Sequence, residues 1–332
     1  MSDPILDHEQ HLFRELQNTV ADRLGMTIIH AVPIRFGYLN RKWKIRTDRG
    51  DYVLKQYSRA RYREDHFPAL HAALFTQNRL HDRGIPCPYL VMSQNDVLHV
   101  SSEGERFSVM TFCHGNIVKP GFLIGRHLYH LGKWTGRMHR FLNDGSMAMP
   151  EEPEPQFIPP SQAERMKHWD RVERELRSKY KTELLPVLER HRAAAAKINL
   201  PLMLQSRAGW AHRDLWTDNL LFSADRLSAI LDFDRLRYDY PEADVARALM
   251  SCCFAQGRFD TSLANAFLEG YREEYPFEQE ALPRSLLMLY WMECEWWIHS
   301  EMDSSSAPPA RFREEMAWLA DHIDEISNGR FI

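Results

Sequence analysis

The sequence contains few cysteines and no long apolar run, and both absences exclude classes of protein. Its 332 residues include five cysteines, none at C-x-x-C spacing. This pattern indicates buried thiols in a reducing compartment rather than a zinc or disulfide framework. No apolar stretch approaches the roughly 18 residues of a membrane span. The first residues have neither the basic nor the apolar segment of a secretory signal. We therefore expect a cytoplasmic protein that has no membrane partner.

Charge of either sign is also not in large excess. The chain has 46 acidic and 42 basic residues and a net charge of −4, which gives no support for nucleic-acid binding. Its 16 histidines are scattered rather than grouped as metal ligands. A hydrophobic content of 44% in a chain of this length is enough for two globular lobes.

The most informative pattern lies between residues 212 and 234. The segment His-Arg-Asp-Leu-Trp-Thr-Asp-Asn carries Asp214 and Asn219, and Asp232-Phe-Asp follows. Phosphoryl transfer requires a carboxylate to orient the attacking hydroxyl and accept its proton, and oxygen ligands to hold Mg²⁺ on a triphosphate. Protein kinases meet both needs with H-R-D-x-x-x-x-N followed by D-F-G. The spacing here indicates a Mg-nucleotide phosphotransferase.

The sequence around this pattern supports the same interpretation. Short apolar segments at 209–211, 220–222 and 227–231, with a turn signal at 223–226, predict a catalytic loop and a hairpin that ends at Asp232. The alternative is a solvated turn of Asp and Asn residues beside a hairpin.

The N-terminal third alternates between predicted helices and strands. Residues 8–24 repeat an apolar residue every four positions from Leu12 to Leu24, which is typical of one helical face. A second helix is expected over 62–82. The predicted strands are 28–36, 41–47, 52–56, 88–93, 97–101 and 107–112.

Helical patterns dominate the rest of the chain. The predicted helices cover 123–142, 161–197 and most of 242–328, with a Pro- and Glu-rich connection at 145–160. We expect an α+β protein with a β-rich N-terminal lobe and a larger helical lobe. The expected limits are 1–112 for the first lobe, 113–121 for the hinge and 122–332 for the second lobe.

Several N-terminal residues are candidates for nucleotide binding. Lys55 lies on the third predicted strand, where a kinase lysine grips the phosphates; alternatively it is an outward-facing strand lysine. The turn from Gly37 to Asn40 could cover the phosphates, although it has one glycine where a G-x-G-x-x-G loop has three. Backbone groups from Met110 to Phe112 could bind the adenine edge, but an ordinary edge strand would look the same.

With these residues in place, the chain resembles the aminoglycoside phosphotransferase/choline kinase family from about residue 33 to 300. The matching segments are RFGYLNRKWKIRTDRGDYVLKQY, DRGIPCP, LGKWTGRMH, HRDLWTDNLLF, AILDFD and EADVARAL. The resemblance implies a two-lobed protein-kinase-like fold and the use of ATP and Mg²⁺. It implies Asp214 as the base, Asn219 and Asp232 as Mg²⁺ ligands and Lys55 on the phosphates.

The resemblance also implies structural roles for two residues near the loop. Asp244 would brace the catalytic loop by hydrogen bonding, or would simply be an acidic residue at a helix N-terminus. His212 would be structural. Within the family, the sequence is most similar to homoserine kinases of the kinase-like type, and it is comparably similar to kinases associated with bacterial spore coats.

Two departures from the protein-kinase pattern are informative. The helix glutamate that pairs with the strand lysine has no obvious match; Ala73 falls at its position, and Glu64 is an alternative partner. Asp234 replaces the glycine of D-F-G. Eleven residues separate Asp232 from Asp244, which leaves no room for an activation segment and disfavours a protein substrate.

An aromatic and acidic segment near residue 290 could bind the acceptor. On a helix, Tyr290, Glu293, Trp297 and Glu301 share one face, which could hold an amine by charge pairing with Glu293 and cation–π contact with Trp297. The alternative is a buried helix with two solvated glutamates. Trp216 and Asp234, close to the base in sequence, are further candidates for acceptor contacts.

The sequence thus predicts an ATP- and Mg²⁺-dependent kinase that phosphorylates a hydroxyl of a small, amine-bearing metabolite such as homoserine or an amino alcohol. An antibiotic kinase of the aminoglycoside type is the nearest alternative. A bacterial protein kinase, or a catalytically weak coat or scaffold protein of the same fold, also stays open. The sequence leaves the acceptor, the preference for ATP over GTP, the pathway and the oligomeric state undetermined.

Overall fold

The protein is described here from a computed structural model that covers residues 4–35, 40–59, 62–151, 154–303 and 310–330. The chain forms two compact units. The first unit comprises Met1–Asn116 and Ser228–Arg235, and the second comprises Ile117–Leu227 and Leu236–Ile332. Residues 228–235 therefore pack with a part of the chain that is more than a hundred positions away in sequence. No helix of the described segments combines the length and the hydropathy needed to cross a membrane.

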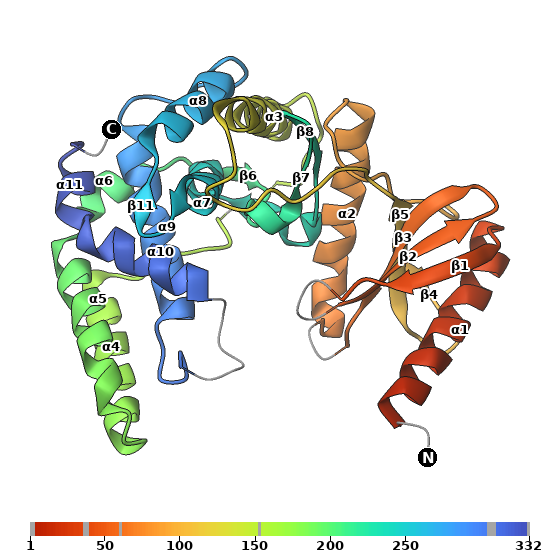
Figure 1. Cartoon of the computed structure of the whole chain (residues 1–332), viewed down its shortest axis with the longest axis horizontal. Helices are drawn as coiled ribbons and strands as arrows, with labels where there is room; N and C mark the ends of the chain where they lie inside the picture. Colours follow the sequence, from red (N-terminus) through yellow and green to blue (C-terminus); the bar gives the residue numbers. More distant parts are fainter. Residues whose placement is uncertain (1–3, 36–39, 60–61, 152–153, 304–309, 331–332) are drawn as a thin grey trace. The chain divides into compact units, whose positions relative to one another are not determined.

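The first unit is an antiparallel sheet with strand order β1-β2-β3-β5-β4 and two helices (Figure 1). Helix α1 packs on the sheet because its leucine and valine stripe, from Leu12 to Leu24, is buried against alternate strand residues such as Trp43 and Ile45. The strands are β1 Ile28–Pro33, β2 Arg41–Thr47, β3 Gly50–Tyr57, β4 His99–Val100 and β5 Arg106–Thr111; the helices are α1 Pro4–Leu24, the short η1 Glu64–His66 and α2 Phe67–Asp82.

One predicted strand of this unit is wrong. Residues 88–93 form isolated bridges rather than a strand, and some of their backbone groups bond to side chains of α2. The Asn78 side chain, on α2, accepts a hydrogen bond from the Leu90 N–H at 2.7 Å and donates one to the Leu90 carbonyl at 2.8 Å. Pro88 lacks an N–H altogether. Two backbone bonds to β5 do form, from the Val91 N–H to the Val109 carbonyl at 2.8 Å and from the Thr111 N–H to the Tyr89 carbonyl at 2.9 Å. The segment therefore touches β5 only at an isolated bridge, and the Asn78 side chain satisfies Leu90 on its other edge.

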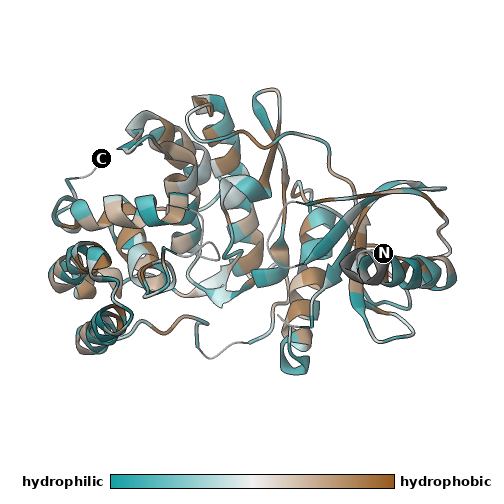
Figure 2. Cartoon of the chain, turned by 60° about the horizontal axis from the view of Figure 1, so that its bottom comes forward, coloured by the Kyte–Doolittle hydropathy of each residue, from teal (hydrophilic) through white to brown (hydrophobic). Residues whose placement is uncertain are grey.

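The second unit is mainly helical, as the sequence indicated. Figure 2 shows brown, hydrophobic residues on the helix sides that face one another and teal residues on the outer sides. The helices are α3 Gly125–Asn143, α4 Gln162–Ser178, η2 Thr182–Leu184, α5 Leu185–Lys197, α6 Leu200–Met203, η3 Thr217–Asn219, α7 Pro241–Cys253, α8 Thr261–Arg272, α9 Ala281–Trp297, α10 Ala310–Asp321 and α11 Ile323–Ser327.

Short strand pairs in this part of the chain frame the predicted catalytic motif. β6 (Gly209–Ala211) pairs with β9 (Arg237–Asp239) in a two-stranded antiparallel sheet. The loop after β6 begins at His212, and α7 begins two residues after β9. β7 (Leu220–Ser223) pairs with β8 (Arg226–Ile230), and β10 (Phe254–Ala255) pairs with β11 (Arg258–Phe259), a hairpin that the sequence did not predict.

Glycines allow α3 and α8 to approach until their backbones touch. A Cβ atom added at Gly132 would lie 1.9 Å from the Phe267 carbonyl oxygen, and one added at Gly270 would lie 2.1 Å from that of Tyr129. Neither backbone oxygen can move aside as a side chain would. The close packing of α3 against α8 therefore requires glycine at both positions.

Replacing Gly132 with alanine is expected to destabilise the protein by about 1–3 kcal/mol or more, because the new methyl group would overpack this contact. The matched control is Gly125→Ala in the same helix, where the added Cβ would meet the Ala266 Cβ at an ordinary 3.8 Å. Urea denaturation of both variants measures the difference in unfolding free energy. Equal stabilities for the two variants would contradict the close approach.

Candidate active site

In the first unit, Lys55 lies at the centre of a buried cluster of charges. Strand β3 places its side chain so that it is 4% exposed. Its Nζ atom lies 2.8 Å from Oδ1 of Asp232 and 2.7 Å from Oδ2 of Asp234. One ammonium therefore donates hydrogen bonds to two carboxylates, which come from positions two residues apart. The sequence predicted functional roles for all three residues but did not predict that they would meet.

The cluster keeps Lys55 charged although it is buried. Burial is the largest influence on its pKa and acts to lower it, but the carboxylates of Asp232 and Asp234 together raise the pKa well above its ordinary value. Burial also dominates at Asp234 and raises the pKa of that carboxyl, with a further contribution from the nearby charge of Asp232. Lys55 and the Tyr62 hydroxyl act in the opposite direction.

Asp234 has further partners in the same unit. The Tyr62 hydroxyl donates to its Oδ2 at 3.0 Å, and the Asn40 side-chain amide donates to the same oxygen at 3.5 Å. The sequence suggested Asp234 as an acceptor contact, and the structure instead places it against Lys55. Glu64, the suggested partner of Lys55, pairs with Arg106 at 2.6 Å, so that expectation is wrong.

The other predicted nucleotide contacts are only partly described. Gly37 lies outside the described residues. The Asn40 Oδ1 accepts a hydrogen bond from the Ser58 N–H at 3.4 Å, in addition to the contact with Asp234. Met110 is the partner of Val53 across β3 and β5. The Phe112 N–H donates to the Asp51 carbonyl at 3.1 Å, so this group serves the sheet of its own unit.

In the second unit, Asp214 and Asn219 form a compact pair. The Asn219 side-chain amide donates to Oδ2 of Asp214 at 2.9 Å and to the Asp214 carbonyl at 2.9 Å. Asn219 is 8% exposed, and it ends the short helix η3 that follows the loop. The five-residue spacing of the motif thus has a geometric reason, since it lets the amide fix both the backbone and the side chain of Asp214.

Asp244, on α7, holds the start of the same loop. Its two carboxylate oxygens accept hydrogen bonds from the N–H groups of His212 at 2.6 Å and Arg213 at 2.7 Å. His139 on α3 lies 3.1 Å from the same carboxylate. The buried His212 ring in turn accepts a hydrogen bond from the Asp214 N–H at 3.2 Å. The loop before Asp214 is therefore held by buried hydrogen bonds.

Two motif residues have a left-handed backbone, which is uncommon outside glycine. Arg213 has φ +66°, and Asp232 has φ +61°. Such conformations cost about 1–3 kcal/mol and persist where the surroundings fix them, often at functional sites. The Asp244 bond to the Arg213 N–H and the Lys55 pair of Asp232 are surroundings of this kind.

The predicted acceptor helix differs from the expectation in two respects. Helix α9 ends at Trp297, so Glu301 does not continue its face; Glu301 is exposed and pairs with Lys179 and Lys181. Tyr290 is fully buried, and its hydroxyl lies 3.0 Å from the His191 ring. Of the face expected to line a cleft, Glu293 and Trp297 remain.

Glu293 belongs to a buried charge cluster that the sequence did not reveal. Arg247, on α7, donates to Glu293 at 2.8 Å and also to Glu315 on α10. The Trp297 indole N–H donates to Glu293 at 2.7 Å. Glu315 is 0% exposed. One hint was available: Arg247 is the single basic residue in an apolar helix, a position where a buried partner is expected.

An aromatic cluster connects α9 and α10 with the catalytic loop. The Phe312 ring lies 4.5 Å from that of Trp297 and 5.2 Å from that of Trp216. The Arg311 guanidinium lies 5.0 Å from the Trp216 ring and donates to the Thr217 hydroxyl at 3.0 Å. Two of the predicted acceptor residues, Trp216 and Trp297, thus contact the same phenylalanine.

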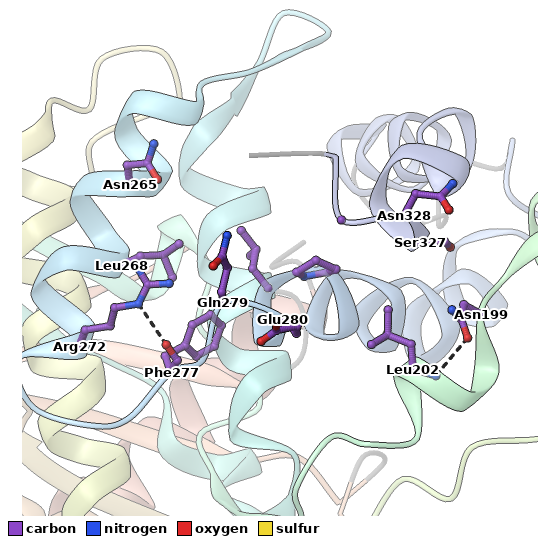
Figure 3. Close-up of a pocket in the computed structure, with 13 residues that line it drawn as sticks. Asn199, Leu202, Asn265, Leu268, Arg272, Phe277, Gln279, Glu280, Ser327 and Asn328 are labelled. Carbon is purple, nitrogen blue, oxygen red and sulfur yellow. Dashed lines mark hydrogen bonds between the residues drawn. The ribbon is translucent and has the colours of Figure 1, made fainter.

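A separate cavity of 820 Å³ lies elsewhere in the second unit (Figure 3). Its walls come from α6, α8, the start of α9 and the C-terminal residues, and Arg272 spans one side by donating to the Phe277 carbonyl at 3.1 Å. None of the predicted site residues lines it.

Comparison with known proteins agrees with this picture. The model of the phosphotransferase enzyme family matches residues 30–281. A homoserine kinase of Sinorhizobium medicae is 29% identical over 252 residues, which cover 74% of this chain and 72% of the relative. A homoserine kinase of Parvibaculum lavamentivorans is 25% identical over 291 residues, which cover 86% of this chain and 84% of the relative.

Solved structures give the same fold. The amicoumacin kinase hAmiN, in complex with AMP-PNP, Ca²⁺ and Ami, aligns with a TM-score of 0.55 at 17% identity and covers 97% of this chain and 96% of that one. The ternary complex of streptomycin, ATP and APH(2")-IIa aligns with a TM-score of 0.56 at 13% identity and covers 98% and 99%. This likeness confirms the kinase-like α+β fold expected from the sequence.

Proposed function

The chain belongs to the phosphotransferase enzyme family and is a small-molecule kinase that phosphorylates a hydroxyl group, and from this premise we propose its donor and its acceptor. The donor is the γ-phosphoryl group of ATP, used with Mg²⁺. The acceptor is the hydroxyl of a small amine-bearing metabolite of the homoserine or amino-alcohol type. The observation that supports the proposal best is the Asp214 loop, whose base, amide and brace are joined by hydrogen bonds.

Asp214 is proposed as the group that orients the acceptor hydroxyl and takes its proton. A general base must be held in position, because small displacements lower the rate steeply. Asn219 holds its carboxylate from one side, and Asp244 holds the backbone of the two preceding residues. These hydrogen bonds are already formed in the protein without substrate, so the base needs little reorganisation before proton transfer.

Lys55, Asn219 and Asp232 are proposed to bind the nucleotide and its metal ion. A carboxylate and an amide are oxygen ligands of the kind that Mg²⁺ accepts together with phosphates and water. The ion would neutralise negative charge on the transferring phosphoryl group. Lys55 keeps its charge despite burial and so can carry phosphate recognition, with Asn40, Gly37 and the backbone at Met110 and Phe112 as further contacts.

Trp216 and Trp297 are proposed to receive the acceptor. Their rings contact the same Phe312 side chain, and aromatic faces attract ammonium groups. The Glu293 carboxylate fixes the Trp297 indole through its hydrogen bond. Homoserine carries an amine and a hydroxyl, and two of the relatives described above are named homoserine kinases.

The purified protein is expected to consume ATP in the presence of homoserine or an amino alcohol. ADP release is measured with a panel that contains L-homoserine, ethanolamine, choline and an aminoglycoside, each with and without Mg²⁺, and ³¹P NMR identifies the phosphate ester. The kinase proposal predicts turnover that depends on Mg²⁺. Turnover of the aminoglycoside alone, or phosphorylation only of added proteins, would contradict the proposed acceptor.

A further inference from the structure

Lys55, which we propose to bind phosphate, has a buried carboxylate partner that the protein-kinase motif does not supply. The helix of the first unit carries Ala73 where protein kinases place a glutamate, and the D-F-G glycine is Asp234 in this chain. We propose that Asp234 is a positioning residue that holds Lys55 in place of the missing helix carboxylate. This inference rests on the proposed role of Lys55 in nucleotide binding.

The two carboxylates on Lys55 differ in how firmly they are held. The Asp234 side chain is 4% exposed, whereas that of Asp232 is 25% exposed. The Tyr62 hydroxyl and the Asn40 amide both donate to the oxygen of Asp234 that contacts Lys55. Asp234 is therefore fixed from several directions inside the first unit, and Asp232 is the partner that solvent can reach.

This difference suggests that the two carboxylates have different roles. A lysine with one carboxylate partner would be drawn wholly to that partner, and removing it would leave a buried charge without compensation. With two partners, Lys55 retains Asp234 as its counter-charge when Asp232 engages another cation. Asp234 thus allows Asp232 to be available without releasing Lys55.

The local backbone explains how both carboxylates reach one ammonium. Asp232 has a left-handed φ of +61°, and the following residues form the short helix η4, Phe233–Arg235. Phe233 is fully buried, and α2 packs against η4. A glycine at position 234 would keep this turn but would remove the counter-charge. The two departures from the protein-kinase motif therefore compensate for each other.

A double-mutant cycle between Lys55→Ala and Asp234→Asn tests the proposal. In the otherwise wild-type protein, Asp234→Asn should lower kcat/KM for ATP on the order of 10- to 100-fold, as for residues that orient a binding side chain. The KM for the acceptor should not change. In the Lys55→Ala protein, the same substitution should change kcat/KM for ATP by less than about twofold, because its effect passes through Lys55.

Two results would overturn the inference. Equal losses with and without Lys55 would mean that Asp234 acts directly on nucleotide or metal, and a raised KM for the acceptor alone would make Asp234 an acceptor contact. Tyr62→Phe serves if Asp234→Asn fails to fold; it removes one hydrogen bond to Asp234 and should lower kcat/KM for ATP by a smaller factor.

Glu64→Gln is the matched control. It removes a carboxylate of the same unit that pairs with Arg106, and it should leave the kinetics unchanged. Failure of the proposed function is distinguishable, because the wild-type protein would then show no turnover and no thermal stabilisation by Mg-ATP.

Discussion

Replacing Asp214 with asparagine is expected to lower kcat by about 10²- to 10⁴-fold, the usual cost of losing a positioned general base. Asparagine has nearly the same shape and can still accept the hydrogen bond from Asn219. It cannot take a proton from the acceptor hydroxyl. The KM for ATP and the melting temperature should therefore stay close to the wild-type values, and the loss should appear in kcat. Steady-state kinetics with the best acceptor of the panel measure the effect.

The matched control for this substitution is Asp225→Asn. Asp225 lies in the turn between β7 and β8, and it forms an ion pair with the exposed Arg126 side chain. We expect this variant to keep nearly full activity. If Asp214→Asn also retained activity within tenfold of the wild type, the base assignment would be wrong.

Replacing Arg247 with methionine is expected to destabilise the protein by about 3–5 kcal/mol, the largest stability effect that the structure predicts. The substitution keeps the apolar length of the side chain but removes the cation shared by Glu293 and Glu315. Glu293 would lose its ion-pair partner, and Glu315, which has no exposed surface, would keep only the Arg311 guanidinium, whose Nε lies 3.7 Å away. Denaturant unfolding at neutral pH measures the loss.

An exposed ion pair between neighbouring helices provides the comparison. Arg190 on α5 lies 3.3 Å from Asp321 on α10, and the two side chains are 47% and 53% exposed. Arg190→Met should cost less than about 1 kcal/mol, because water screens such pairs. A similar loss for both variants would show that burial of the Arg247 cluster does not determine its contribution to the free energy of unfolding.

The elements that the sequence predicted well are those with a local cause. The four-residue repeat from Leu12 to Leu24 requires only a helix with one buried face, and it forms one. The strand predicted at 88–93 is reduced to isolated bridges, and the Leu90 backbone groups bond to the side chain of Asn78, twelve positions away. Apolar periodicity reports burial, and it does not report which group satisfies the backbone.

The same distinction applies to the candidate site. Asp214 and Asn219 are close in sequence, so their spacing could be interpreted before the structure was known. The pairing of Lys55 with Asp234 joins residues 179 positions apart, and that of Arg247 with Glu315 joins residues 68 positions apart. The sequence therefore suggested Glu293 as an acceptor contact and gave no indication that Arg247 is its partner. A single sequence can hint that a residue such as Arg247 has a buried partner, but it does not show which residue that partner is.

The division of the chain into two units also determines which fragments would keep the Lys55 ion pairs. Residues 228–235 belong to the first unit, although the segments on both sides of them belong to the second. A fragment that ended at Asn116 would keep every strand of the five-stranded sheet but would lack both carboxylate partners of Lys55. The five-stranded sheet therefore depends on the distant eight-residue segment for the two carboxylates that pair with Lys55.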